Sequence, residues 1–332
     1  MSTTSVERAD ALLAISTWPR YPSLYEINTW VWLNDLSQKY HKAITLSTVP
    51  ENEWEAIAGY GFDAIWFMGV WERSPAGVAI ANRNDDLLHD FLRALPDFHT
   101  EDNVGSPYCV RRYRVDSHLG GPEGLATARR ELAKRGLKLI LDFVPNHVAP
   151  DHPWVAEHPE YFMHGSDEDV RNDSGSYMEV HGTVFARGRD PYFPAWPDVL
   201  QLNAFEPGLR QVVIDTLSDI ADQSDGVRCD MAMLFLSSIF ERTWDGRAGP
   251  PPASEYWMEV ISGMKSRFPN FLFIAEAYWD LEWQLQQQGF DFCYDKRLYD
   301  RLEHANAESI RLHLSADEVP PFAVPIAMLV LS

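Results

Sequence analysis

The feature that most constrains the fold of this chain is a rhythm of short apolar runs that alternate with longer amphipathic stretches. The amphipathic stretches begin near proline or acidic residues, and one ends on basic residues and glycine, as helix ends do. This alternation is typical of a parallel sheet covered by helices. The expected strands are 24–31, 62–68, 137–144, 226–231, 271–275 and 290–294, and the expected helices are 50–58, 121–136, 207–224 and 253–268.

One interval, 148–205, interrupts the rhythm with many Pro, Gly, Asp, His and aromatic residues. A structureless loop of this length is uncommon unless it is functional, so we expect an excursion after the third strand that covers one side of a site. A disordered linker is the alternative, and large aromatic residues such as Trp154 and Trp196 argue against it. The expected organisation is a first barrel part over 1–147 (strands 1–3), an irregular insertion over 148–205, a barrel continuation over 206–318 (strands 4–6) and an atypical tail over 319–332.

Charge and cysteine content limit the kinds of binding partner and the cellular compartment that we expect for this chain. The 49 acidic residues outnumber the 28 basic ones, and this field repels nucleic acid and anionic membranes, so neutral substrates are expected. Cys109, Cys229 and Cys293 cannot all pair and show no CxxC spacing, which predicts reduced thiols and a cytoplasmic setting. No apolar run reaches the about 20 residues of a membrane span, and the first residues lack the apolar segment of a secretory signal.

Polar side chains follow three of the expected strands. Asp142, Asn146 and His147 close the third strand, although a simple strand-end turn would explain them equally well. Arg228 and Asp230 follow in the fourth strand, on the same side because they lie two residues apart. A guanidinium beside a carboxylate favours the charged carboxylate that a glycosidase nucleophile requires, and an ordinary ion pair is the alternative.

Glu276 follows the fifth strand and is bordered by aromatic residues. Apolar surroundings disfavour its charged form and suit it to donate a proton, whereas a rim carboxylate bonded to a backbone amide is the alternative. Reactive groups of parallel barrels gather at the carboxyl ends of the strands. Together, Asp230 and Glu276 predict the pair of carboxylates that glycoside hydrolysis needs.

These segments resemble the signature regions of the α-amylase superfamily, glycoside hydrolase family 13. The matching motifs are Asp142 to His147, Gly226-Val-Arg-Cys-Asp230, Glu276, Gly61-Phe-Asp-Ala-Ile-Trp-Phe and the loop from Ser106 to Asp116. The resemblance runs from about residue 24 to about residue 312. It implies an α/β fold, a (β/α)8 TIM-type barrel that is incomplete at its C-terminus.

The resemblance also implies roles. Asp230 would attack the anomeric carbon, Glu276 would protonate the leaving oxygen and then activate water or an acceptor sugar, and Arg228 would orient Asp230. The substrate would be an α-glucan oligosaccharide or a disaccharide.

For substrate binding, the resemblance implies that His147 bonds sugar hydroxyls with support from Asp142, and that Tyr108 stacks under the ring. Asn146 corresponds to a calcium ligand in some members. No cofactor is expected to be required, and calcium stays unassigned. Of the twelve tryptophans, Trp66 and Trp279 are the first candidates to face the substrate.

The sequence departs from the family pattern at two places, and both departures bear on the activity that we expect. Met233 and Leu234 stand where polymer-degrading members often carry Lys and His. The contacts on the acceptor side must therefore differ, and action on a small oligosaccharide or transfer of a glucosyl unit fits as well as starch hydrolysis. No Asn-His-Asp motif follows Glu276, from which we expect a chain cut short, or shifted in frame near Asp317, with little activity alone. The alternative function is an inactive barrel fragment that binds sugar or serves as a scaffold.

Overall fold

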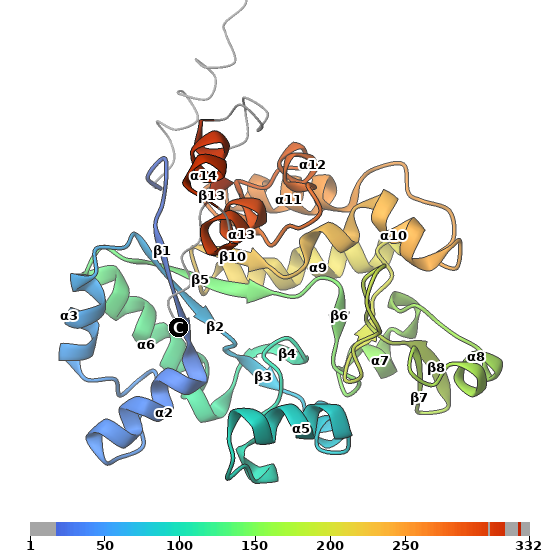
Figure 1. Cartoon of the computed structure of the whole chain (residues 1–332), viewed down its shortest axis with the longest axis horizontal. Helices are drawn as coiled ribbons and strands as arrows, with labels where there is room; N and C mark the ends of the chain where they lie inside the picture. The colour runs from blue at the N-terminus through green and yellow to red at the C-terminus, as the bar shows by residue number, and fades with distance from the viewer. Residues whose placement is uncertain (1–17, 305, 316–324, 327–332) are drawn as a thin grey trace, which may run out of the picture.

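The computed structural model describes residues 18–304, 306–315 and 325–326. Its centre is a curled sheet of seven strands, all paired in parallel (Figure 1). Each of the six expected strands forms, and strands that follow one another along the chain lie side by side in the sheet. In spatial order the strands are β1 (Leu24–Asn28), β2 (Ala64–Met68), β5 (Lys138–Phe143), β10 (Gly226–Cys229), β11 (Leu272–Ala275), β12 (Phe292–Tyr294) and β13 (Pro325–Ile326).

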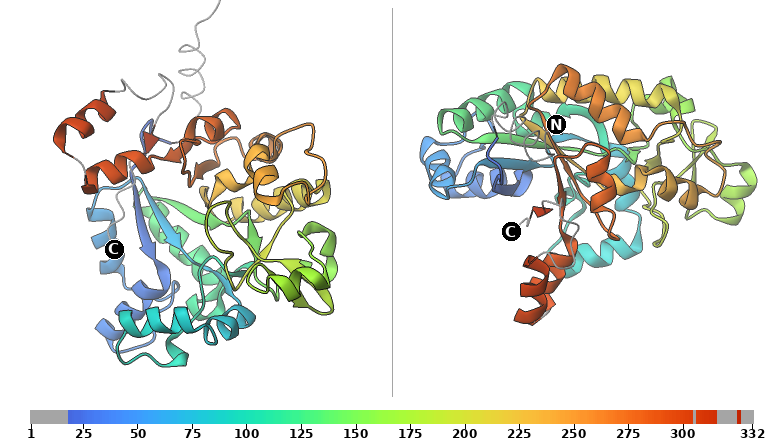
Figure 2. Two further views of the ribbon diagram at one scale, coloured as in Figure 1. Left: turned by 45° about the vertical axis from the view of Figure 1, so that its right-hand side comes forward. Right: turned by 90° about the horizontal axis from the view of Figure 1, so that it is seen from above.

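Helices connect the strands, and Figure 2 shows α6, α9 and α11 along the outer side of the curled sheet. The expected helices form as α3, α6, α9 and α11. The helices are α2 (Thr29–Tyr40), α3 (Glu51–Gly59), α4 (Pro75–Ala81), α5 (Asp85–Ala94), α6 (Gly121–Lys134), α7 (Trp154–Glu157), α8 (Asp167–Asn172), α9 (Pro207–Ala221), α10 (Ser237–Trp244), α11 (Tyr256–Arg267), α12 (Glu282–Gln287), α13 (Lys296–His304) and α14 (Ala307–Leu314), with 3-10 turns at Thr100–Asp102, Ser117–Leu119, Pro159–Tyr161 and Ala232–Phe235.

The first strand is shorter than expected. The apolar run over 24–31 predicts a strand, but β1 ends at Asn28. The Asn28 side chain accepts a hydrogen bond from the Val31 amide and so caps helix α2, which starts at Thr29. A helix cap, which satisfies a free backbone donor, outweighs the β propensity of the residues that follow.

Alternation along the strands separates two apolar layers. Leu139 and Leu141 of β5 pack in the outer layer with side chains of the helices, whereas Ile140 lies in the inner cluster with Trp66 and Ile274. The registers pair Arg228 with Asp142 on one side and with Ile274 on the other. Because successive side chains of a strand point to opposite faces, Asp142, Arg228 and Ile274 all lie on the concave side of the sheet.

The excursion over 148–205 contains short elements of its own and lies to one side of the sheet, far from α2 and α3 (Figure 1). Strand β6 (His147–Val148) pairs antiparallel with β9 (Leu200–Gln201), so the excursion closes on itself at its base. β7 (Tyr177–Val180) and β8 (Thr183–Ala186) form a hairpin within it, and β3 (Trp71–Arg73) pairs with β4 (Val110–Val115) in the loop region before it.

The four predicted segments of the chain remain predictions. Most of the tail over 319–332 lies outside the described residues, and within it only Pro325–Ile326 are described, paired with β12. Among the described residues, no helix combines the length and the apolar character that crossing a membrane requires.

Candidate active site

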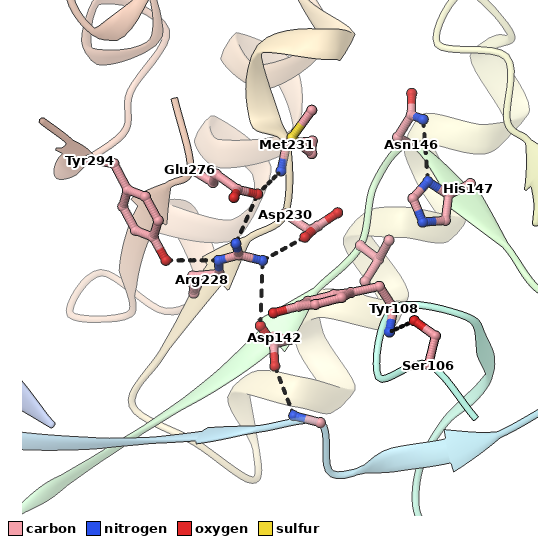
Figure 3. A network of polar contacts seen from close by, with 12 residues as sticks. Ser106, Tyr108, Asp142, Asn146, His147, Arg228, Asp230, Met231, Glu276 and Tyr294 are labelled. Carbon is pink, nitrogen blue, oxygen red and sulfur yellow. Dashed lines mark hydrogen bonds and ion pairs between the residues drawn. The ribbon is translucent and has the colours of Figure 1, made fainter. Parts of the chain in front are cut away.

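Arg228 is the centre of the polar network at the carboxyl ends of β5, β10, β11 and β12 (Figure 3). Its Nη1 lies 2.6 Å from Asp230 Oδ1, and its Nη2 lies 2.8 Å from Glu276 Oε2. Its Nε donates to the Tyr294 hydroxyl at 3.0 Å. The guanidinium is almost fully buried, and planar donor geometry of this kind holds several partners in fixed directions.

Asp230 and Glu276 therefore share one guanidinium. Two carboxylates that both contact one guanidinium lie within the upper limit of about 9.5 Å that separates the catalytic carboxylates of glycosidases. Backbone hydrogen bonds fix the arrangement: Asp230 N–H donates to the Phe143 carbonyl at 2.8 Å, and Glu276 N–H donates to the Cys229 carbonyl at 3.0 Å. The strands themselves thus place the two carboxylates that the sequence indicated beside one another.

The surroundings of Glu276 act on the pKa of its carboxyl group in opposite directions. Burial is the largest and raises the pKa of this carboxyl group, and the negative charge of Asp230 raises it further. Arg228, the Tyr278 hydroxyl at 2.7 Å from Oε1 and the Met231 amide at 2.7 Å from Oε2 all favour the charged form. Burial prevails, so the pKa of Glu276 is raised, which suits a group that must donate a proton near neutral pH.

Met231, directly after Asp230, has φ 44° and ψ 44°, a left-handed conformation that is uncommon for a residue with a long side chain. The amide N–H of Met231 donates to Glu276 Oε2 at 2.7 Å. The sequence did not identify Met231, because no glycine or proline at this position indicates a left-handed backbone conformation.

The carboxylates line a cavity of about 300 Å³. The lining residues are Ser106, Tyr108, His147, Trp196, Asp198, Val199, Arg228, Asp230, Met231 and Glu276. The structure therefore brings together most of the residues that the sequence suggested, and it adds Trp196 from the excursion. The His147 and Trp196 rings lie 5.1 Å apart, and Arg228 lies 5.3 Å from the centre of the Tyr108 ring.

His147 is neutral in this environment. Burial lowers the pKa of His147 to about 4, against a smaller opposing influence of Asp198. A neutral imidazole offers one donor and one acceptor, which suits hydrogen bonding to an uncharged ligand.

Asp142 lies beneath the cavity rather than among its lining residues. Its side chain is 1% exposed, Oδ2 accepts from the Gly69 amide at 3.0 Å, and Oδ1 lies 3.7 Å from Arg228. Burial raises the pKa of Asp142 to about 7 in spite of the nearby guanidinium. This position supports Arg228 from below and gives Asp142 no surface on the cavity.

Asn146 also lies behind the cavity, 1% exposed, where it forms hydrogen bonds with Gln201. Its Oδ1 accepts from the Gln201 amide at 2.8 Å, and the expectation that Asn146 could hold calcium stays a prediction. Among the described residues there is no group of three or more His, Cys, Asp or Glu side chains arranged to hold a metal ion.

Tyr294, on β12, was missed by sequence reasoning. The signal was present, since an aromatic residue with a polar tip ends an apolar strand, but its contact with Arg228 depends on strand order. The expectation that Trp66 faces the substrate is wrong: Trp66 is 2% exposed and packs in the inner cluster, 5.2 Å from the Arg228 guanidinium.

A second cavity of about 390 Å³ adjoins the first, because Met231 lines both. Tyr278, Trp279 and Phe193 provide aromatic surface there. Trp279 has φ 62°, and its ring lies 4.7 Å from the Tyr192 ring of the excursion. The expectation that Trp279 faces substrate stays a prediction, and its position at this cavity is compatible with it.

A curled parallel sheet that gathers two carboxylates and an arginine at its carboxyl-end edge defines the class: a barrel-type α/β protein with an acidic, aromatic-walled cavity. Comparison with known families is more specific. The family described as "Alpha amylase, catalytic domain" matches residues 53–288. The chain belongs to the α-amylase family.

Curated relatives include alpha-1,4-glucan:maltose-1-phosphate maltosyltransferase 2 of Streptomyces coelicolor, 27% identical over 231 residues that cover 67% of this chain and 28% of that protein. The corresponding maltosyltransferase of Bifidobacterium longum is 26% identical over 233 residues, 68% of this chain and 25% of that protein. The chain thus spans less than a third of the length of these two relatives.

Solved structures show the same fold. An α-amylase from Lactobacillus plantarum aligns with a TM-score of 0.60 at 20% identity, over 92% of this chain and 62% of that one. A cyclic α-maltosyl-(1→6)-maltose hydrolase from Arthrobacter globiformis aligns with a TM-score of 0.57 at 16% identity, over 91% of this chain and 63% of that one.

Proposed function

We propose that the chain carries the catalytic carboxylates of a retaining glycoside hydrolase or glucosyltransferase that acts on α-glucosidic bonds of oligosaccharides. The observation that carries the proposal is the buried guanidinium of Arg228, which contacts both Asp230 and Glu276 at the wall of one cavity. The names of the curated relatives, α-1,4-glucan maltosyltransferases, support an α-glucan substrate.

The reaction would follow two displacements. In the first, an Asp230 oxygen bonds to the anomeric carbon while the glycosidic bond breaks, and Glu276 gives its proton to the leaving oxygen. In the second, water or an acceptor hydroxyl gives a proton to the Glu276 carboxylate and attacks the anomeric carbon, and the bond to Asp230 breaks. Glu276 regains its proton, Asp230 its charge, and the anomeric configuration is retained.

The cavity residues suit the binding steps. Tyr108 and Trp196 offer aromatic surface for a sugar ring, and neutral His147 offers a hydrogen bond without charge. The second cavity, with Tyr278 and Trp279, lies on the Glu276 side and would receive the leaving or accepting sugar. In the proposal Asp142 acts through Arg228, as a positioning residue.

The proposal extends to the barrel and to the cellular setting of the chain. The seven described parallel strands would form the greater part of a (β/α)8 barrel that is incomplete as described, and the structural neighbours support this reading. The three free, buried cysteines support the expected cytoplasmic setting. No cofactor takes part in the proposed steps.

Turnover on maltooligosaccharides and on sucrose, with the product anomer read by NMR, tests the proposal. Because the chain alone is expected to have little activity, we expect slow turnover with α-configured first products, and loss of that turnover in Asp230→Ala. With azide and an activated aryl glucoside, Glu276→Ala should give the glucosyl azide of retained configuration, whereas Asp230→Ala should give the azide of inverted configuration. Inverted product would contradict the retaining mechanism. Oligosaccharide binding without turnover that is unchanged in Asp230→Ala would favour the sugar-binding alternative.

A further inference from the structure

The junction between the excursion and the sheet contains a fully buried amide, that of Gln201 on β9. Gln201 pairs with His147 of β6 across the base of the excursion. Its Nε2, which carries two hydrogens, lies within hydrogen-bond distance of three oxygens: the Asn146 carbonyl at 3.0 Å, Asn146 Oδ1 at 2.8 Å and the Leu202 carbonyl at 3.0 Å. A nitrogen enclosed by three oxygens occupies the kind of position that a small cation takes in other proteins.

One backbone amide and one side-chain amide fix the orientation of the Gln201 side chain. Gln201 Oε1 accepts from the Arg189 amide at 3.3 Å and from Asn146 Nδ2 at 3.1 Å. If the side chain turned over to present Oε1 to a cation, Nε2 would face the Arg189 N–H and Asn146 Nδ2, both of which are donors. A buried amide without acceptors is unfavourable, so the observed orientation is the stable one.

We propose that the Gln201 amide nitrogen replaces a calcium ion at this junction, so that the excursion is joined to the sheet without metal. Calcium requires six to eight oxygen ligands. Here both oxygens of Asn146 already accept from Gln201. The described residues also contain no cluster of three or more acidic, His or Cys side chains that could complete such a site. This inference does not depend on the proposed catalytic roles.

The same amide pair reaches the cavity. Asn146 Nδ2 lies 3.3 Å from His147 Nδ1 (Figure 3). Since Nδ2 can only donate, Nδ1 accepts and the ring proton of neutral His147 lies on Nε2. Gln201 is therefore a positioning residue that sets the His147 tautomer through Asn146.

The first test measures calcium dependence of the unmodified chain. We expect the same thermal unfolding midpoint in calcium chloride and in EDTA at matched ionic strength, with magnesium chloride as the salt control, and no stoichiometric uptake of radioactive calcium in equilibrium dialysis. One bound calcium ion that raises the midpoint, and that is lost in Asn146→Ala, would overturn the proposal.

The second test changes the amide. Gln201→Glu replaces the enclosed nitrogen with oxygen, so the variant should unfold at a lower temperature than the unmodified chain in EDTA and recover part of the loss in calcium. Gln38→Glu, with the same charge change on the exposed face of α2, should lose little under either condition. A Gln201→Glu chain as stable in EDTA as the unmodified one would overturn the proposal. If the variant does not fold, the calcium measurement on the unmodified chain decides.

A third measurement reads the tautomer directly. Long-range ¹H–¹⁵N NMR of the His147 ring should show the proton on Nε2. In Asn146→Asp, which presents an oxygen to Nδ1, the proton should move to Nδ1. A proton on Nδ1 in the unmodified chain would contradict the positioning role of the amide pair.

Discussion

At the scale of single residues, the site depends on how Arg228 is held. Its three donor groups are directed to Asp230, Glu276 and Tyr294, and the rings of Trp66, Tyr108 and Tyr294 all lie within 5.2–5.6 Å of it. A guanidinium so enclosed cannot rotate without losing several contacts. The orientation of both carboxylates therefore follows from the orientation of this one side chain.

Tyr294→Phe removes the hydrogen bond to Arg228 Nε and keeps the ring. A buried hydrogen bond to a charged group contributes about 1.5–3 kcal/mol, so we expect kcat to fall about tenfold or more, with a smaller change in KM. Steady-state kinetics measure both. Tyr299→Phe, exposed on α13, is the matched control. An unchanged kcat in Tyr294→Phe would show that the hydroxyl does not position Arg228.

Tyr278→Phe tests which groups set the pKa of Glu276. The Tyr278 hydroxyl favours charged Glu276, so its removal leaves burial less opposed and raises the pKa of Glu276 further. Because the proposed acid must be protonated, the alkaline limb of kcat/KM against pH should move to higher pH. Tyr60→Phe, on an exposed tyrosine, should leave the profile in place. A shift of the limb to lower pH would contradict this account of Glu276.

Asp142→Asn tests the buried carboxyl. The pKa of Asp142 is raised from 3.8 to about 7, so its contribution to stability is complete below about pH 4 and is lost as the pH rises through about 7. Each unit of such a shift corresponds to about 1.4 kcal/mol. Urea unfolding should therefore show that the free energy of unfolding of the unmodified chain, relative to Asp142→Asn, declines between about pH 4 and about pH 7. A difference that is constant with pH would refute the shift.

At the scale of strands and helices, alternation explains how the sequence predicts the site. Asp142, Arg228 and Glu276 follow apolar strands at positions whose side chains point to the concave face, so period and spacing were sufficient to group them. The left-handed Met231 and the partnership of Tyr294 with Arg228 depend on backbone conformation and strand neighbours, which periodicity does not encode. Helix α2 was missed because its first residues, Thr29 to Trp32, have β propensity.

Gly226 illustrates how closely neighbouring strands approach beneath the site. A Cβ there would meet Leu272 Cβ and the Leu272 carbonyl oxygen at 2.7 Å, and Ile140 Cδ1 at 2.9 Å. Gly226→Ala should lower the free energy of unfolding by about 1–3 kcal/mol, as overpacking does. Gly59→Ala, at the end of α3 with nothing within 4 Å, should be neutral or stabilising. Equal stabilities in chemical denaturation would show that the strands separate readily at β10.

At the scale of the whole molecule, the excursion and the sheet share the candidate site. The sheet supplies Arg228, Asp230 and Glu276, and the excursion supplies Trp196 to one cavity and Phe193 to the other. The sequence indicated that 148–205 would cover one side of a site, but not which aromatic residues would reach it. Those contacts depend on the β6–β9 pairing and on the buried Gln201 amide beneath it.

The central claim is that Asp230 and Glu276, held across one cavity by Arg228, carry out a double displacement. Trapping of the covalent intermediate tests it most directly: the protein is incubated with a 5-fluoro-α-glucosyl fluoride, and the adduct is located by peptide mass spectrometry. We predict one glycosyl adduct on Asp230, absent in Asp230→Ala. An adduct on another residue, or turnover without any adduct on Asp230, would contradict the account.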